Sequence, residues 1–244
     1  MGDIILVTSG KGGVGKSTIC SCIGRELSKM GKKTVLVELD SGLRCLDIML
    51  NISENVVYDI GDVFSKRCPL EKAVVKASEN NMLFLLPASS SFDQNPAADD
   101  VLEICRTLSR SHDYVIIDAP AGLGKGLDRG FRICDMALLV VTPDMVCVRD
   151  AEKMTRRLDD LGIKNQRLLI NKVKENFTKL NILPDLDYVI DQTATRLIGV
   201  VPEDDNVTVK TSMGSELNKN SLANECFRRI AKRICNENIP LAMR

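Results

Sequence analysis

Hydrophobic and polar positions follow two alternating patterns along the chain. Short runs such as Val115-Ile116-Ile117 and Leu138-Leu139-Val140-Val141 are apolar on both faces, which is typical of strands that helices cover on both sides. We expect strands at 3–8, 34–38, 82–86, 114–118, 136–142, 167–171 and 196–201. Between them, the spacing predicts helices at 16–30, 100–109, 145–161 and 225–235. This alternation predicts an α/β fold with a mostly parallel sheet covered by helices on both faces.

The organisation of the chain favours one domain. Its 244 residues would suffice for one large domain or two small ones. The sequence contains no internal repeat, no low-complexity tract and no obvious linker, and the turn-rich stretch 88–99 is typical of a long surface loop within a domain. We therefore expect residues 1–244 to form a single domain.

Composition and charge argue against several classes of protein. The longest uninterrupted apolar run, 136–141, is much shorter than the roughly 20 residues that a membrane-spanning helix needs. With 33 basic and 33 acidic residues, the chain lacks the positive excess that general nucleic-acid binding requires. Nine scattered cysteines without a Cys-x-x-Cys pair, and a single histidine, argue against zinc-ribbon and iron–sulfur sites. We expect reduced thiols in a cytosolic protein.

A glycine-rich turn between the first expected strand and the first expected helix carries the strongest chemical signal. Residues 10–17 read Gly-Lys-Gly-Gly-Val-Gly-Lys-Ser, which fits the phosphate-loop pattern G-x-x-x-x-G-K-[ST]. Gly12, Gly13 and Gly15 permit backbone conformations that a Cβ atom would oppose, so successive N–H groups can surround an anion. The helix that follows adds the positive end of its dipole. The turn therefore predicts a site for nucleotide phosphates.

Three side chains at the start of that helix complete the predicted site. We expect Lys16 to reach the β- and γ-phosphates, the hydroxyl of Ser17 to ligate Mg²⁺, and Thr18 to donate to the α-phosphate. A loop of this kind acts through positioning and the stabilisation of negative charge. The sequence thus predicts a nucleoside triphosphate and Mg²⁺ as cofactors.

The loop also contains Lys11, a second lysine that a generic phosphate loop does not need. The stretch Lys-Gly-Gly-Val-Gly-Lys-Ser-Thr at 11–18 resembles the deviant Walker A signature of the MinD/ParA ATPases. The resemblance implies that the nucleotide is ATP, that the loop including Val14 contacts it, and that Lys11 reaches the nucleotide of a partner subunit. Lys11 and Lys16 would then both neutralise charge on the β–γ bridge and the γ-phosphate during hydrolysis.

The second expected strand ends in Glu38-Leu39-Asp40 and continues into Gly-Leu-Arg-Cys-Leu-Asp at 42–47, which resembles the switch I stretch of MinD proteins. Carboxylates at the ends of parallel strands project into the crevice where α/β sheets bind ligands. The resemblance implies that Asp40 orients the attacking water and that Glu38 lies near the metal ion. The usual residue at position 38 in the family is Asp, and either carboxylate could instead cap the segment that follows.

The run 113–118 is an apolar strand that delivers Asp118 to its carboxyl end. There Asp118 can hold the hydration shell of Mg²⁺, as a Walker B acid does. The following Pro120-Ala121-Gly122 resembles the switch II of MinD proteins. The resemblance implies that the N–H group of Gly122 meets the γ-phosphate.

Two later segments resemble the parts of the family that surround the adenine base. Asn171 follows Leu168-Leu169-Ile170, and an Asn amide suits adenine because it both donates and accepts hydrogen bonds. Pro202 and Glu203 belong to a Val-Pro-Glu turn that would line the base pocket. The resemblance covers nearly the whole chain and is closer to MinD than to ParA, mainly through residues 42–47.

The last helical segment differs from the end of bacterial MinD proteins. Leu222, Cys226, Ile230 and Ile234 are four residues apart, and basic residues occupy other faces, so the helix is amphipathic. It aligns with the family's core-packing helix rather than with the membrane helix that follows it, so we expect it to pack on the sheet. Contact with a membrane should then be weak or indirect, in a cytoplasmic protein that is at most peripheral at the inner face of the cell membrane.

The leading interpretation is a MinD-type ATPase switch. ATP and Mg²⁺ join two subunits into a homodimer, the dimer presents a surface to a protein regulator or effector of the MinC or MinE kind, and hydrolysis releases it. The expected role is placement of the division site or another spatial-positioning task. The alternatives are a ParA-type ATPase that partitions DNA or cargo, with DNA binding weak at most, a metallocluster carrier and an amidoligase.

Overall fold

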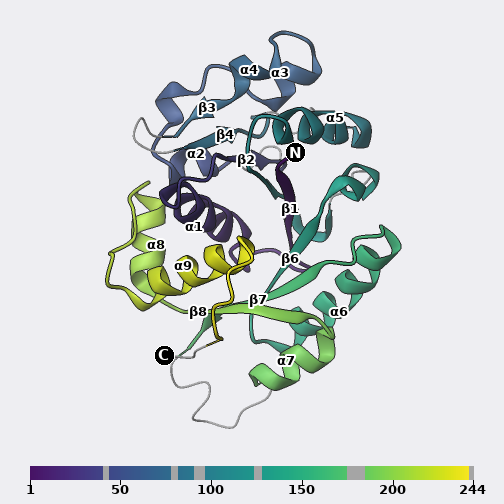
Figure 1. Ribbon diagram of the computed structural model, residues 1–244, viewed down its shortest axis with the longest axis vertical. Helices are drawn as coiled ribbons and strands as arrows, with labels where there is room; N and C mark the ends of the chain where they lie inside the picture. The colour runs from purple at the N-terminus through teal and green to yellow at the C-terminus, as the bar shows by residue number, and fades with distance from the viewer. Residues whose placement is uncertain (41–43, 78–81, 91–96, 124–127, 175–184, 242–244) are drawn as a thin grey trace.

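The apolar runs lie at the centre of one sheet in the computed structural model (Figure 1). The structure describes residues 1–40, 44–77, 82–90, 97–123, 128–174 and 185–241. Their strands are β1 (Asp3–Thr8), β2 (Thr34–Glu38), β3 (Val75–Lys76), β4 (Leu83–Leu86), β5 (Tyr114–Asp118), β6 (Met136–Val141), β7 (Gln166–Val173) and β8 (Arg196–Pro202). Their α-helices are α1 (Lys16–Lys29), α2 (Leu46–Met49), α3 (Ile60–Phe64), α4 (Leu70–Ala73), α5 (Ala98–Ser109), α6 (Met145–Asp160), α7 (Leu186–Thr193), α8 (Asp205–Ser212) and α9 (Leu222–Ile234). The 3₁₀ helices are η1 (Ser53–Asn55), η2 (Ala121–Leu123) and η3 (Asp128–Ile133).

The described strands form an eight-stranded sheet in the order β3-β4-β2-β5-β1-β6-β7-β8. Neighbouring strands are parallel except for β3 and β4, which pair antiparallel. The central strands β2 and β5 are buried along their whole length, as their two-sided apolar runs predict. The predicted α/β fold class is therefore confirmed. That residues 1–244 form one domain stays a prediction, with which the continuous sheet is consistent.

Helices cover both faces of this sheet (Figure 1). On one side α1 packs against α9 and against β2 and β5, and on the other side α6 packs against α7 and β6. The strands are in a register that places Val7 and Glu38 on either side of Asp118. Because these strands end together, the phosphate loop and the segments after β2 and β5 meet at one edge of the sheet.

Helix α9 packs on the sheet through its inner face, as predicted. Phe227, Ile230 and Ile234 are buried, whereas Leu222 at the start of the helix is 55% exposed. A Cβ atom on Gly199 of β8 would lie 2.5 Å from Cγ1 of Ile230, so only glycine allows this close approach. In the described part of the chain, no helix combines the length and the apolar character needed to cross a membrane.

The end of the described chain is fastened to α9 and β8 by one guanidinium group. Nη1 of Arg233 donates to the carbonyl of Ile198 at 2.7 Å, and Nε donates to the carbonyl of Ile239 at 3.0 Å. Nη2 donates to the carbonyl of Pro240. The pairing of β8 with β7 shifts at this point, because Leu197 pairs with Leu168 and Gly199 with Leu169. Ile198 is thus the extra residue of a bulge, and Arg233 satisfies its carbonyl.

Candidate nucleotide site

The phosphate loop joins the buried strand β1 to helix α1. Gly15 precedes the helix with a φ of 97°, a left-handed conformation that favours glycine. No side chain caps this end of α1, and its first turn contains no acidic residue. The free N–H groups and the positive end of the helix dipole are therefore available to an anion, as the sequence predicts.

Lys16 lies against the base of the loop rather than in solvent. Its side chain is almost wholly buried, and Nζ donates to Oγ of Ser9 at 3.3 Å. The Ser9 hydroxyl in turn donates to the carbonyl of Lys11 at 2.6 Å. These contacts hold the ammonium group at the foot of the loop, from where a phosphate ligand would draw it.

Asp118 is the most unusual carboxylate of the site. It ends β5, it is 1% exposed, and neither of its carboxylate oxygens makes a well-formed hydrogen bond with the described residues, although the Ser17 hydroxyl and the Cys20 thiol lie near them. Burial raises the pKa of Asp118 to about 7, an effect that the nearby Ser17 hydroxyl and Lys16 ammonium oppose and that Glu38 and Asp40 increase. A buried carboxylate without partners is costly, so this group suits a bound cation.

The donor set around Asp118 fits Mg²⁺. Mg²⁺ prefers oxygen ligands, and it keeps several waters while taking one or two carboxylates and the phosphates of a substrate. Asp118 and the Ser17 hydroxyl at the start of α1 are oxygen donors of this kind. Thr18 follows in the first turn of the same helix, as its predicted contact with the α-phosphate requires.

Glu38 lies beside Asp118 in the neighbouring strand, but both of its carboxylate oxygens accept hydrogen bonds from the backbone. Oε1 accepts hydrogen bonds from the backbone N–H groups of Cys45 at 2.7 Å and Leu46 at 3.0 Å, and Oε2 accepts one from Ala88 at 3.3 Å. Burial raises the pKa of Glu38, and these backbone donors oppose the shift. The carboxylate thus anchors α2 and the segment after β4. Its role near the metal stays a prediction that these contacts do not support.

Asp40 follows β2 at the same edge of the sheet. It is half-buried, and its charge is one of the smaller causes that raise the pKa of Asp118. The N–H group of Leu39, between Glu38 and Asp40, donates to the carbonyl of Asp118 at 3.0 Å. The resemblance to switch I extends into 41–43, which lie outside the described residues. The role of Asp40 in orienting water stays a prediction.

Lys11 forms an ion pair within its own chain. Its side chain is 47% exposed, and Nζ lies 3.5 Å from Oδ1 of Asp144, the residue that caps the N-terminus of α6. Burial tends to raise the pKa of Asp144, but donors from Thr142 and Cys147 and the Lys11 ammonium hold it below its usual range. Lys11 is therefore paired within the chain in this conformation.

The segments predicted to surround adenine lie side by side. Val173 of β7 pairs with Pro202 of β8, and the N–H group of Glu203 donates to the carbonyl of Val173 at 2.9 Å. Nδ2 of Asn171 donates to the carbonyl of Val14 at 2.8 Å, which ties β7 to the phosphate loop. The structure thus brings Asn171, Pro202 and Glu203 to the loop's side of the sheet, and their contact with a base stays a prediction.

Sequence reasoning missed two sets of residues at this site. Nζ of Lys172 donates to the carbonyl of Gly13 at 2.9 Å; the family's Asn-Arg/Lys pattern at the end of this strand includes Lys172 but assigns it no contact with the loop. Arg157 of α6 donates through Nη1 to the carbonyl of Gly122 at 3.1 Å and also pairs with Asp128. The N–H group of Gly122, predicted to meet the γ-phosphate, donates to the carbonyl of Ser9 at 3.1 Å.

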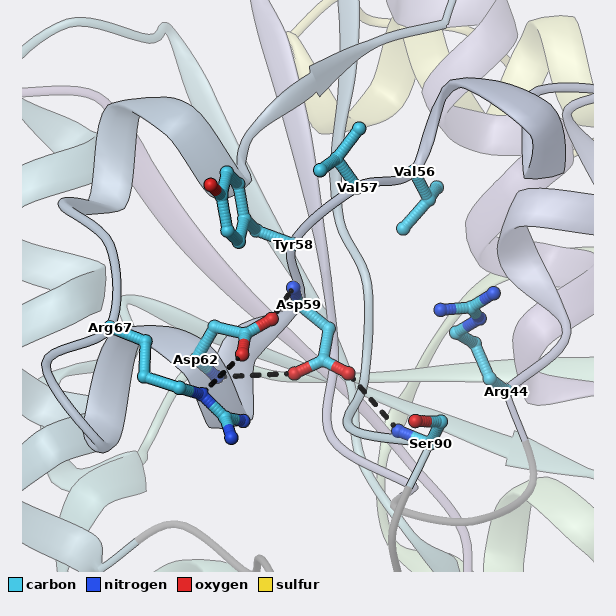
Figure 2. Close-up of a pocket in the computed structure, with 8 residues that line it drawn as sticks. All are labelled: Arg44, Val56, Val57, Tyr58, Asp59, Asp62, Arg67 and Ser90. Atoms are coloured by element: carbon cyan, nitrogen blue, oxygen red, sulfur yellow. Dashed lines mark hydrogen bonds and ion pairs between the residues drawn. The ribbon is translucent and has the colours of Figure 1, made fainter.

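A hollow of about 510 Å³ lies next to the switch I stretch (Figure 2). Arg44 and Arg67 enter it from opposite sides, and Ser90 closes another side. Both acidic residues of the hollow interact with other residues that line it. Asp59 accepts a hydrogen bond from the N–H group of Ser90 at 3.2 Å, and Asp62 forms an ion pair with Arg67 at 2.7 Å. None of its lining residues belongs to the phosphate loop, so the hollow is separate from the predicted nucleotide contacts.

Comparison with known proteins places this geometry in a family. The chain matches the CobQ/CobB/MinD/ParA nucleotide binding domain over residues 5–217. It is 34% identical over 246 residues to the septum site-determining protein MinD of Bacillus subtilis, and the match covers 99% of this chain and 92% of that protein.

Solved structures agree with this match. MinD in the MinC:MinD cell division protein complex of Aquifex aeolicus superposes with a TM-score of 0.91 at 34% identity, covering 98% of each chain. A septum site-determining MinD of Pyrococcus horikoshii, complexed with Mg-ADP, has the same fold, with a TM-score of 0.86 at 23% identity over 98% of this chain and 100% of that one. The chain therefore belongs to the CobQ/CobB/MinD/ParA family of nucleotide-binding proteins, and its relatives within that family are the MinD proteins of division-site placement.

Proposed function

We propose that this protein is an ATP- and Mg²⁺-dependent dimerising ATPase that acts as a switch in the placement of the division site. The observation that carries the proposal is Asp118, a fully buried carboxylate with no well-formed hydrogen bond to the described residues, at a strand end beside a phosphate loop. A phosphate loop alone would bind an anion. The addition of an uncompensated buried acid fits the binding of a nucleotide together with its cation.

Each residue would then have a distinct task. The loop glycines Gly12, Gly13 and Gly15 and the start of α1 would bind the phosphates, and Lys16 would leave Ser9 to pair with the β- and γ-oxygens. Mg²⁺ would supply charge neutralisation between those phosphates, with Ser17 and Asp118 holding it and its waters. Asp40, which follows β2 at the same edge of the sheet, would orient a water molecule for attack.

The dimer part of the proposal concerns Lys11. Its side chain is half exposed, and among the described residues its ammonium group forms an ion pair with one carboxylate, that of Asp144. Exposed ion pairs of this kind are weak, so the lysine can exchange this partner for the phosphates of a second subunit. The homodimer would join through the phosphate-loop edge of each sheet. A protein regulator comparable to MinC would bind the dimer, and any membrane contact would be weak or indirect because α9 packs on the sheet.

The test is the dependence of ATP affinity on Mg²⁺. Calorimetry of the wild-type chain should give tighter ATP binding with Mg²⁺ than with a chelator. In Asp118→Asn that gain should largely vanish, because contacts to charged groups contribute about 1.5–3 kcal/mol, or roughly ten- to a hundredfold in affinity.

Asp191→Asn, which changes an exposed acid of α7, is the control and should bind like the wild type. Wild-type affinity that does not change with Mg²⁺, or an Asp118→Asn variant that keeps the full gain, would refute the proposal. The described residues offer no specific observation in favour of the partitioning, cluster-carrier or amidoligase alternatives.

A further inference from the structure

Arg157 joins the last turn of α6 to the segment that follows β5. Nη1 donates to the carbonyl of Gly122 at 3.1 Å, while Nε and Nη2 both donate to Oδ2 of Asp128, the former at 3.2 Å. The side chain is 42% exposed. A planar guanidinium group holds its donors in a rigid fork that suits two acceptors in fixed positions, whereas the donors of an ammonium group rotate and are not held in one plane.

The backbone that Arg157 holds is strained. Gly122 has a φ of 71° and the next residue, Leu123, has a φ of 69°. The left-handed region is unfavourable for a residue with a Cβ atom and persists where the surroundings hold it in place. Leu123 is fully buried, and the N–H group of Gly122 donates to Ser9 at the foot of the phosphate loop. The segment is thus fixed from three sides.

Asp128 depends on the same guanidinium group. Its Oδ1 atom has no hydrogen-bond partner among the described residues, and its Oδ2 atom is paired with Arg157. The pair is partly exposed, with 32% of the Asp128 side chain open to solvent, so its charge–charge attraction is weak and its main effect is to hold the guanidinium group in place. Loss of Arg157 would therefore release both Gly122 and Asp128 from the last turn of α6.

The present position of Gly122 is not compatible with the contact predicted for it. Its N–H group is occupied by the carbonyl of Ser9, and it would have to leave that partner to meet a γ-phosphate. ADP lacks a γ-phosphate, so its binding does not require the N–H group of Gly122 to leave the carbonyl of Ser9. Any group that stabilises the present position of Gly122 therefore weakens ATP binding relative to ADP binding.

We propose that Arg157 is a positioning residue that restrains Gly122 in the resting conformation and so lowers the preference of this protein for ATP over ADP. The proposal rests on the proposed function, because it concerns the same nucleotide site. It also makes α6 a connection between both nucleotide-sensing loops. Arg157 holds Gly122 from the last turn of α6, and Asp144 at the start of α6 holds Lys11 of the phosphate loop.

The experiment compares the dissociation constants of ADP and of a non-hydrolysable ATP analogue, both with Mg²⁺, by calorimetry. The ratio of the ADP constant to the analogue constant should rise about fivefold or more in Arg157→Met, the usual lower range of coupling between sites. Arg157→Lys should give an intermediate ratio, because lysine keeps a charge near Asp128 without the rigid planar fork that reaches Gly122 and Asp128 together. Arg156→Met is the matched control, since Arg156 pairs with Glu152 of its own helix, and its ratio should equal that of the wild type.

The ratio distinguishes positioning from a general loss of structure, which would weaken both nucleotides alike. An unchanged or lowered ratio in Arg157→Met overturns the proposal. If Arg157→Met does not fold, Arg157→Lys provides the test. A ratio in Arg157→Lys that is no higher than the wild-type ratio would then contradict the proposal. A wild-type chain that binds neither nucleotide would instead refute the proposed function, and the role of Arg157 with it.

Discussion

At the scale of single residues, the site combines a well-satisfied carboxylate and an unsatisfied one in adjacent strands. Glu38 accepts three backbone hydrogen bonds, whereas Asp118 beside it accepts none from the described residues. Both are buried, so the difference lies in what surrounds each group rather than in its depth. The first stabilises the fold, and the second reduces stability until a cation compensates it.

Without Mg²⁺ and nucleotide, we expect Asp118 to make the protein less stable as the pH rises. The pKa of Asp118 is about 7 in the folded chain and 3.8 when the group is unperturbed, so the folded state retains a proton that the unfolded state releases between these values. The free energy of unfolding therefore falls as the pH rises from about 4 to 7, by on the order of 1.4 kcal/mol for each pH unit at most. Thermal unfolding measured across this range should show the decrease.

Asp118→Asn provides the comparison for this pH dependence. Asparagine has nearly the same shape and does not titrate, so the slope of stability against pH should be smaller in the variant, and its stability above pH 7 should be higher. Glu38 also has a raised pKa, and because its charge raises that of Asp118, the difference between the two profiles reports Asp118 together with its interaction with Glu38. Parallel pH profiles for the two proteins would contradict the raised pKa of Asp118.

The sequence predicted the residues of the site that lie within one motif, and it missed those that depend on distant contacts. The phosphate loop, Lys16 and Asp118 lie where their motifs require, because a strand end and a helix start fix their positions locally. Arg157 is separated from Gly122 by 35 residues, and no local pattern marks such a contact. The three backbone partners of Glu38 come from two segments that only the fold brings together.

At the scale of elements, the burial of its apolar residues shows that the amphipathic helix α9 packs in the core. Its buried positions include Phe227, Ile230 and Ile234, which lie toward α1 and β8. Its basic residues are partly paired, as Arg228 and Arg229 both bind Glu225 at 2.8 Å. The apolar face is thus in use within the fold and is not available to lipid.

We expect opposite ends of the α9 apolar stripe to respond differently to truncation. Ile230→Ala should lower the free energy of unfolding by about 2–5 kcal/mol, because it opens a cavity against Gly199. Leu222→Ala should have little effect, since Leu222 is 55% exposed. Denaturant unfolding measures both, and equal, small effects would mean that α9 does not pack as described.

The elements that the sequence left unassigned include α7 and α8, of eight residues each, the 3₁₀ helices, and the short elements between β2 and β4. Helices α2, α3 and α4 have four or five residues each, and β3 has two. Segments this short form no stable structure alone and have no periodicity long enough to recognise. They are held by contacts from outside, such as the Glu38 carboxylate at the start of α2 and the carbonyl of Pro87, which accepts from the N–H group of Ile60 at the start of α3.

At the scale of the whole molecule, the loops that would sense the nucleotide gather at one edge of the sheet. Lys11 is exposed there and bound to Asp144 of its own chain. A face-to-face dimer would replace this intramolecular pair by a contact with the phosphates of the second subunit. ATP would therefore be part of the interface that it induces.

We expect Asp40→Ala to form a stable dimer with ATP and Mg²⁺, because it should bind the nucleotide without hydrolysing it. Loss of a positioned catalytic group lowers a rate by on the order of 10²–10⁴-fold. The double variant Lys11→Ala/Asp40→Ala should bind ATP and stay monomeric. Size-exclusion chromatography with light scattering reports both states. A dimer of the double variant would show that Lys11 is not needed across the interface, and an Asp40→Ala protein that stays monomeric would contradict the dimer itself.

The bulge at Ile198 has a consequence for how copies of this protein can associate. β8 is an outer strand of the described sheet, and the outer strand of a regular sheet is a template on which another chain can add hydrogen bonds. Here the ladder is broken by an extra residue whose carbonyl is taken by Arg233, and the same guanidinium group binds the segment that ends near Pro240. A strand of another copy therefore pairs poorly with β8, and edge-to-edge joining of sheets into fibres is disfavoured. Pairing between copies is thereby discouraged along β8, whereas the proposed dimer would join through the carboxyl ends of the strands, beside the phosphate loop.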